Sequence, residues 1–177
     1  LSQIPGVYVP SMYSVTYDGD FIASVEPRFA DVPATVDKRT VADLGEWPYP
    51  KSPIVPLTEV VHDRLSVEVF RGCTRGCRFC QAGYIYRPVR ERQPDTIRNL
   101  IDQMLRHSGH DEVSLLSLST GDYSAIEILM QNLMGCYAGQ RVAVSLPSLR
   151  VGSLTPALMN EIKKVRKTGF TLAPEAG

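Results

Sequence analysis

Short apolar runs alternate with amphipathic stretches from residue 65 onward, and this alternation constrains the fold more than any other feature of the chain. The apolar runs fall at 65–70, 113–118, 142–146 and 170–173, and each has the length of a buried strand. The stretches between them repeat apolar residues at helical spacing. Parallel strands joined by helical crossovers curl into barrels, so we predict an α/β chain of about three and a half β-α units. These units would form a partial (β/α) barrel, truncated after about the fourth strand.

Start and stop signals predict where the intervening helices lie. Proline at a first-turn position and a following glycine place the first helix over 94–109. The second is expected to begin at a capping box made by Ser124 and Glu127. A threonine cap followed by proline predicts the third over 155–169.

The first 60 residues have a different character, because eight of the 13 prolines lie between Pro5 and Pro56. Proline fixes φ and removes a backbone donor, which favours extended loops. We therefore predict a covering or linking segment over 1–60 and a core domain over 61–177. Within the first segment, Gly19 lies between two strand-like runs and predicts a β-hairpin.

Charge and composition narrow the classes of partner. Lys and Arg number 19, as do Asp and Glu, so a formal net charge of +0 gives no global reason to bind nucleic acid or an anionic membrane. No apolar run approaches membrane-spanning length, and no signal-like segment is visible. The expected location is the cytoplasm, where thiols stay reduced. The chain starts at Leu1 and stops at Gly177 soon after a strand-like run, which suggests part of a longer protein.

Three cysteines follow the first predicted strand in a C-x3-C-x2-C run, at Cys73, Cys77 and Cys80. Structural zinc sites use four protein ligands, usually on two separated arms, and no second arm is present here. A 4Fe-4S cluster held by three thiolates leaves one iron open to a ligand, which would make the site catalytic. A zinc site that borrows His62 or Cys136 is the alternative, although we expect Cys136 to be a small buried residue.

With the aromatic Phe79 before its last cysteine, the run resembles the signature of the radical S-adenosylmethionine (SAM) superfamily. Residues 68–86, 117–123, 145–153 and 171–177 resemble uncharacterised members that are often associated with cobalamin-binding domains. The resemblance implies part of a six-unit barrel that binds a 4Fe-4S cluster and SAM. It also implies an electron donor such as flavodoxin or ferredoxin, and cobalamin only through a domain outside this chain. The implied reaction is reductive cleavage of SAM to a 5′-deoxyadenosyl radical, which abstracts hydrogen from an unidentified substrate.

Loops after the predicted strands are expected to converge, because active sites of such barrels lie at the C-terminal ends of the strands. In the family, a Gly-Gly-Glu type motif binds the SAM amino group, and residues 120–122 match it loosely. Arg150 offers a guanidinium for a carboxylate, and 174–177 resembles a glutamate-containing turn near the SAM ribose. The cysteines are the candidate cluster ligands, and Phe79 would back the adenine. The candidate cofactor-binding residues are Phe79, Thr120, Gly121, Asp122, Ser145, Arg150 and Glu175.

Simpler interpretations stay open beside these assignments. Turn chemistry accounts for 119–123, and a surface arginine accounts for Arg150. Residues 84–92 interleave two tyrosines with three arginines, a mixture that could contact RNA, but loop packing with solvated arginines is the favoured interpretation. Two other classes of function are a zinc-bound RNA- or protein-binding module and a radical SAM scaffold without catalysis.

Overall fold

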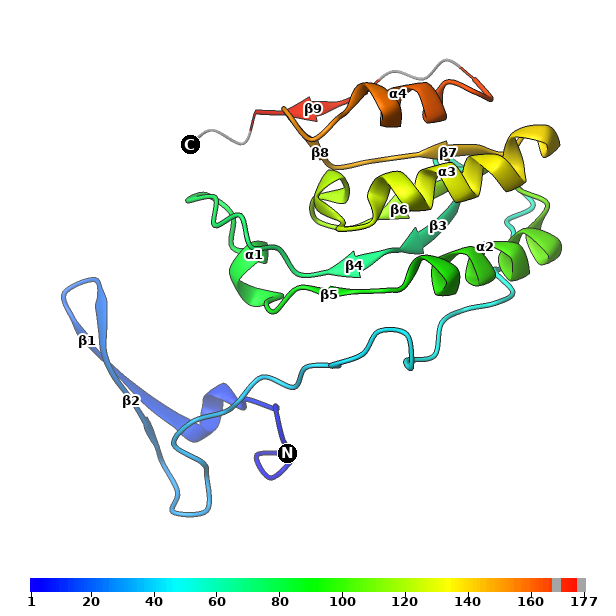
Figure 1. Ribbon diagram of the computed structural model, residues 1–177. Coiled ribbons are helices and arrows are strands. Elements are labelled where there is room, and N and C mark those ends of the chain that lie inside the picture. Colours follow the sequence, from blue (N-terminus) through cyan, green and yellow to red (C-terminus); the bar gives the residue numbers. More distant parts are fainter. Residues whose placement is uncertain (167–169, 175–177) are drawn as a thin grey trace. The chain divides into compact units, whose positions relative to one another are not determined.

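The computed structural model describes residues 1–166 and 170–174, and it divides into two compact units, Leu1–Val41 and Ala42–Gly177 (Figure 1). The second unit includes residues that precede the boundary predicted at residue 60. Leu44 is buried, and the Tyr49 hydroxyl accepts a hydrogen bond of 3.0 Å from the backbone N–H of Glu68. The division into domains at residue 60 stays a prediction.

The first unit is built around the predicted β-hairpin. A short 3-10 helix, η1 (Pro10–Met12), leads into β1 (Tyr13–Asp18), which pairs antiparallel with β2 (Phe21–Pro27). Gly19 begins the turn with a φ of 58°, a left-handed conformation that glycine adopts without a steric penalty. The hairpin prediction is therefore confirmed.

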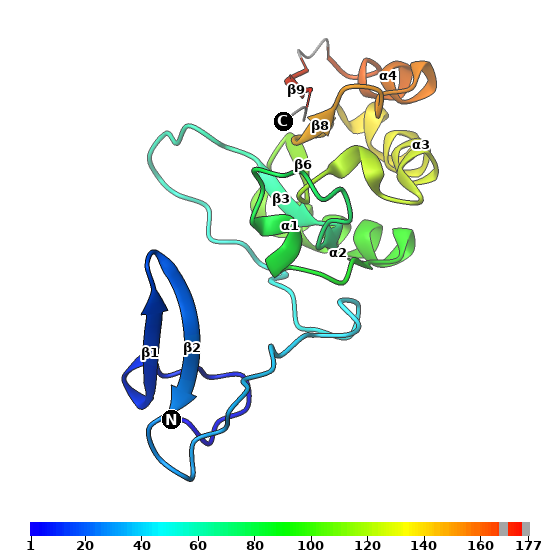
Figure 2. The ribbon, with the colours of Figure 1, turned by 90° about the vertical axis from the view of Figure 1, so that its left-hand side faces the viewer.

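A three-stranded parallel sheet forms the centre of the second unit (Figure 2). Its strands are β3 (Leu65–Glu68), β6 (Glu112–Leu116) and β7 (Ala143–Ser145), in the order β3-β6-β7. Buried and less buried residues alternate along β3, as they do when one face of a sheet packs on helices. The sheet and its helices confirm the α/β class.

The helices that connect these strands begin largely where local signals place them. Helix α2 (Pro94–Ser108) starts with its proline and ends at Gly109, which has a left-handed φ of 71°. Helix α4 (Pro156–Ile162) is capped by Thr155, whose side-chain oxygen accepts a backbone N–H of the first turn. It ends before the predicted Gly169, which lies outside the described residues. Among the described helices, none is both long enough and apolar enough to cross a bilayer.

The predicted capping box of the remaining helix is wrong. Helix α3 (Ile126–Tyr137) begins two residues after Ser124 and has no side-chain cap of its own. Ser124 instead donates from its backbone N–H and its hydroxyl to Glu91, and Glu127 accepts a hydrogen bond of 2.6 Å from Thr155. Both members of the expected pair are thus engaged by residues that are distant in sequence.

Several short elements outside the central sheet complete the described part of the second unit. They are β4 (Phe70–Arg71), α1 (Ala82–Ile85), β5 (Arg90–Glu91), η2 (Thr120–Asp122), η3 (Ala138–Gln140), β8 (Leu149–Arg150) and β9 (Leu172–Ala173). β4 pairs antiparallel with β5, and β8 pairs parallel with β9. Ser148, with a φ of 58°, separates β7 from β8. In the described ranges the predicted fourth strand thus pairs with β8 and not with the central sheet, and no closed barrel forms.

The core lies between the sheet and helices α2, α3 and α4. On α3 it includes Leu133, Met134 and Tyr137, all nearly inaccessible to solvent. Cys136 falls between these positions on the helix and is exposed, so the expectation that it is buried is wrong.

Candidate functional site

The loop that leaves β4 and leads to α1 carries the three cysteines. Cys73, Cys77 and Cys80 form no disulfide, and each is half-buried. Gly72 fixes the base of this loop: its φ is 94°, and a Cβ atom added there would lie 2.6 Å from the carbonyl oxygen of Pro88. Only glycine avoids both the strained φ and this contact, so the loop starts pressed against the segment that returns to β5.

An open cavity of about 430 Å³ lies beside this loop, and all three cysteines line it. Its remaining walls come from the cysteine loop itself, from the loop after β6 and from the segments at β8 and β9. The other lining residues are Arg75, Phe79, Leu118, Ser119, Ser148, Leu149, Arg150, Thr171 and Ala173. Segments that are far apart in sequence therefore meet at the cysteines, which is the convergence that the barrel interpretation predicts.

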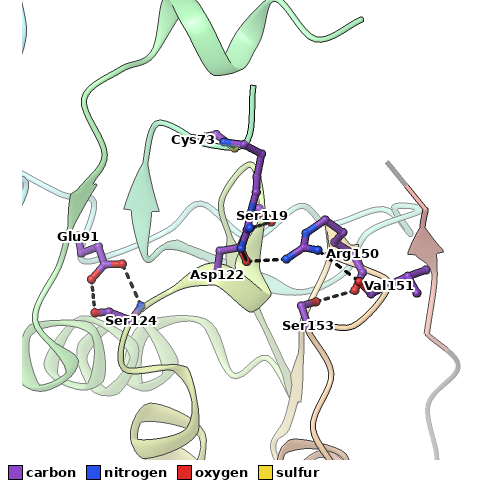
Figure 3. Close-up of polar contacts among 9 residues, drawn as sticks. Cys73, Glu91, Ser119, Asp122, Ser124, Arg150, Val151 and Ser153 are labelled. Atoms are coloured by element: carbon purple, nitrogen blue, oxygen red, sulfur yellow. Dashed lines mark hydrogen bonds and ion pairs between the residues drawn. The ribbon is translucent and has the colours of Figure 1, made fainter. Parts of the chain in front are cut away.

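Asp122 is held beside this cavity by Arg75 and Arg150, two of the arginines that line it. Figure 3 shows the contact between Asp122 and Arg150. Its carboxylate accepts a hydrogen bond of 2.7 Å from Nε of Arg75, and the same guanidinium also bonds the second oxygen. Arg150 donates from Nη2 at 3.3 Å, and the Ser119 hydroxyl donates at 2.6 Å. The carboxylate thus joins the cysteine loop to β8 and to the loop after β6.

These contacts keep Asp122 ionised. Hydrogen bonding from Arg75 is the largest influence on its pKa; burial opposes it, while Ser119 and Arg150 reinforce it. The net effect lowers the pKa of Asp122 to about 2. At neutral pH the side chain is therefore an anion that pairs with two guanidiniums.

Thr120 and Gly121 build the turn that presents Asp122. The Thr120 side chain is fully buried, and its hydroxyl donates to the carbonyl oxygen of Leu115 at 3.3 Å. A Cβ atom added at Gly121 would lie 2.5 Å from Oγ of Ser153, so the two backbones approach closely here. Neither residue is among those that line the cavity.

The remaining predicted residues fall in different places. Arg150 lines the cavity, and its Nε is buried without a hydrogen-bond partner. Phe79 also lines the cavity, with 66% of its surface exposed. Ser145 lies on β7 opposite Ser114, and its hydroxyl donates at 3.5 Å to a backbone carbonyl oxygen of β6. Glu175 lies outside the described residues.

Residues 84–92, the segment that interleaves tyrosines with arginines, help to hold the cysteine loop in place. Arg92 is 3% exposed, and its guanidinium bonds the carbonyl oxygens of Glu68 and Leu44. Arg87 lies over the ring of Tyr84 at 4.7 Å and donates to the carbonyl oxygen of Cys73. The packing interpretation therefore accounts for Arg92 and Arg87.

A single metal ion and an iron-sulfur cluster place different demands on the side chains that bind them. In residues 1–166 and 170–174, no three His, Cys, Asp or Glu side chains are grouped so as to hold one metal ion. A polynuclear cluster spaces its thiolates more widely than a single ion does, and three cysteines on the wall of one cavity fit such a group. Cys136 lies on α3, and His62 contacts Arg64 before β3, so neither belongs to the cysteine loop.

Comparison with known proteins identifies the class to which this fold and site belong. The family model described as the radical SAM superfamily matches residues 67–177, and the chain therefore belongs to that superfamily. An uncharacterized protein of Methanocaldococcus jannaschii is 40% identical over 113 residues, which cover 63% of this chain and 23% of that protein. The chain thus spans less than a quarter of the length of this curated relative. Membership in the superfamily supports SAM-dependent radical chemistry in general.

Sequence reasoning missed two residues of the site, Arg75 and Ser119. Arg75 stands between two cysteines, and its partner Asp122 is 47 residues away. Ser119 directly precedes the motif assigned to 120–122. An arginine inside a ligand loop and a candidate carboxylate elsewhere were the available signals, but sequence spacing alone could not pair them.

Proposed function

We propose that Cys73, Cys77 and Cys80 hold a 4Fe-4S cluster with one open iron, and that SAM binds in the adjoining cavity. The observation that carries this proposal is the placement of three half-buried cysteines on the wall of one cavity, together with Arg75 and Arg150. When bound, the cluster and SAM supply reductive cleavage of SAM and hydrogen abstraction from a substrate. The chain would then be the cluster-bearing part of a radical enzyme.

The protein side chains bind and orient in this proposal. Arg150 is suited to a ligand carboxylate because its planar guanidinium donates in a fixed fork, and its Nε has no partner in the structure. Phe79 offers an exposed ring on which an adenine could stack. Asp122 acts through the arginines that it orients, because its carboxylate is already engaged by them. Ser145 and Glu175 stay predicted contacts.

We also propose that the second unit is part of a larger barrel. The parallel order β3-β6-β7 and the parallel pair β8-β9 support this interpretation. The chain covers 23% of its relative, so the groups that recognise the substrate are proposed to lie elsewhere in the whole protein. Any cobalamin would likewise bind a domain outside this chain.

An electron donor is the expected macromolecular partner. Residues 71–92 contain six arginines and one glutamate, although the chain as a whole has a net charge of +0. A local excess of positive charge beside the cysteines favours approach of an acidic redox protein such as a flavodoxin or ferredoxin. None of the four cysteines forms a disulfide, which fits a reducing compartment, and we propose that this is the cytoplasm.

Anaerobic reconstitution with iron and sulfide tests the proposed cluster. We expect a brown protein with about four irons per chain, a charge-transfer absorption band, and loss of both in Cys77→Ala. Cys136→Ala is the matched control, because it removes an exposed cysteine on α3 and should retain the iron. Colourless protein with one tightly bound zinc per chain would instead support the zinc module.

Formation of 5′-deoxyadenosine from SAM under dithionite tests the enzyme class, and it should be measured in the whole protein as well as in this chain. If iron is bound but neither makes 5′-deoxyadenosine, the scaffold interpretation replaces the enzyme. The iron measurement and the turnover measurement therefore separate the three functions.

A further inference from the structure

We infer that Arg75 is a positioning residue: its ion pair with Asp122 fastens the middle of the cysteine loop to the turn after β6 and thereby sets the spacing of the three thiols. The inference rests on the proposed function for its consequence, the retention of a cluster. The fastening itself is a property of the chain without any metal.

The position of Arg75 in the loop explains how its ion pair can influence the cysteines. Arg75 lies two residues from both Cys73 and Cys77, so displacement of its backbone displaces both thiols. Its own backbone N–H donates to Sγ of Cys73 at 3.5 Å. A side chain that is anchored outside the loop therefore controls a backbone segment that contacts a thiol.

The anchor is rigid because several independent contacts hold it. Asp122 ends η2, a turn whose Thr120 N–H donates to the carbonyl oxygen of Ser148 at 3.1 Å and whose Gly121 packs against Ser153. The Asp122 side chain is 18% exposed, whereas that of Arg75 is 45% exposed. The more buried partner is thus the carboxylate, and the guanidinium reaches out from the loop to meet it.

The geometry of the Arg75–Asp122 pair is more tightly defined than that of an ordinary surface ion pair. Exposed pairs contribute little, but two parallel N–H···O contacts from one guanidinium to one carboxylate fix orientation as well as distance. Both Nε and Nη2 of Arg75 engage Asp122. Lysine at this position would keep the charge and lose the fork.

Hydrogen exchange of the metal-free chain tests the fastening directly. We expect Arg75→Gln and Asp122→Asn each to speed amide exchange in peptides covering 73–80 by about fivefold, with the double variant no faster than either single one. Arg78→Gln, an arginine substitution in the same loop, is the matched control and should exchange like the parent chain. The inference fails if Arg75→Gln and Arg78→Gln behave alike.

Iron retention tests the consequence. After reconstitution, Arg75→Gln should lose iron to a chelator about fivefold faster than Arg78→Gln, and Arg75→Lys should recover only part of the difference. The double variant Arg75→Asp with Asp122→Arg, which exchanges the two charges, should retain iron better than either single substitution alone. Failure of the parent chain to bind iron would contradict the proposed function alone, whereas unchanged exchange in Arg75→Gln would contradict this inference alone.

Discussion

Glu91 holds Ser124, the residue two positions before helix α3, because its carboxylate accepts both the backbone N–H of Ser124, at 2.9 Å, and the Ser124 hydroxyl (Figure 3). Glu91 belongs to β5, the strand that leads away from the cysteine loop. The start of α3 and the return of the loop are therefore held by one carboxylate. An acid at this end also complements the helix dipole.

Replacing Glu91 with Ala should lower the free energy of unfolding by about 1 kcal/mol, because the Ser124 N–H and the helix dipole lose their partner. Urea denaturation followed by circular dichroism measures the change. Glu26→Ala, in the first unit, removes a carboxylate without touching α3 and serves as the control. Equal stability of the two variants would show that the contacts of Glu91 with Ser124 do not stabilise the fold.

Gly72→Ala should destabilise the second unit by roughly 2 kcal/mol or more, because the added Cβ meets a backbone carbonyl oxygen at 2.6 Å and φ is 94°. Gly135→Ala is the contrasting substitution. It lies within α3 with open space around the added Cβ, so alanine there should be neutral or stabilise by about 0.5–1 kcal/mol. Thermal unfolding of the two variants compares them, and an equally stable Gly72→Ala would contradict the close approach.

Asp122 predicts a pH dependence of stability. Its pKa is lowered from 3.8 to about 2, so the folded state favours the anion and binds fewer protons than the unfolded state between these values. Its contribution, about 2 kcal/mol at most, is present above pH ~4 and is lost as the pH falls through ~2. Denaturant titrations of the parent chain and Asp122→Asn should therefore differ at pH 7 and converge in strong acid. A constant difference across this range would show that ionisation of Asp122 is not responsible.

Tyr123 should ionise at a higher pH than an ordinary tyrosine, and its ionisation should destabilise the folded state. Burial is the main cause, aided by Glu91, of a rise in its pKa to about 12. A raised pKa in the folded state means that the stability due to neutral Tyr123 is complete below pH ~10 and decreases as the pH rises toward ~12. Ultraviolet titration of the parent chain against Tyr123→Phe isolates this group. The phenylalanine variant also loses the 2.7 Å hydrogen bond to the Arg92 carbonyl oxygen, which should cost about 1 kcal/mol.

The parts of the fold that sequence predicts well are those that neighbouring residues determine. Pro94 and Gly109 bound α2, and Thr155 caps α4, because each signal acts within one helical turn. The hairpin at Gly19 depends on a local φ in the same way. The three cysteines line one cavity because their spacing lies within a single loop.

The predictions that failed depended on long-range partners. The capping box at Ser124 was replaced by Glu91, which is 33 residues away in the chain. The assignment of Asp122 to a ligand amino group stays a prediction, but its pairing with arginines from two other segments was not foreseen. Tertiary contacts of this kind leave no periodic or spacing signal in one sequence, so only the fold reveals them.

Gly72 also helps to close the base of the loop that carries the cysteines. Its close approach to Pro88 and the pairing of β4 with β5 bring the two ends of the 72–89 segment together. The segment is therefore a module closed at its base. Insertions or deletions inside it would alter the reach of the thiols while leaving the strand register, and hence the rest of the unit, unchanged.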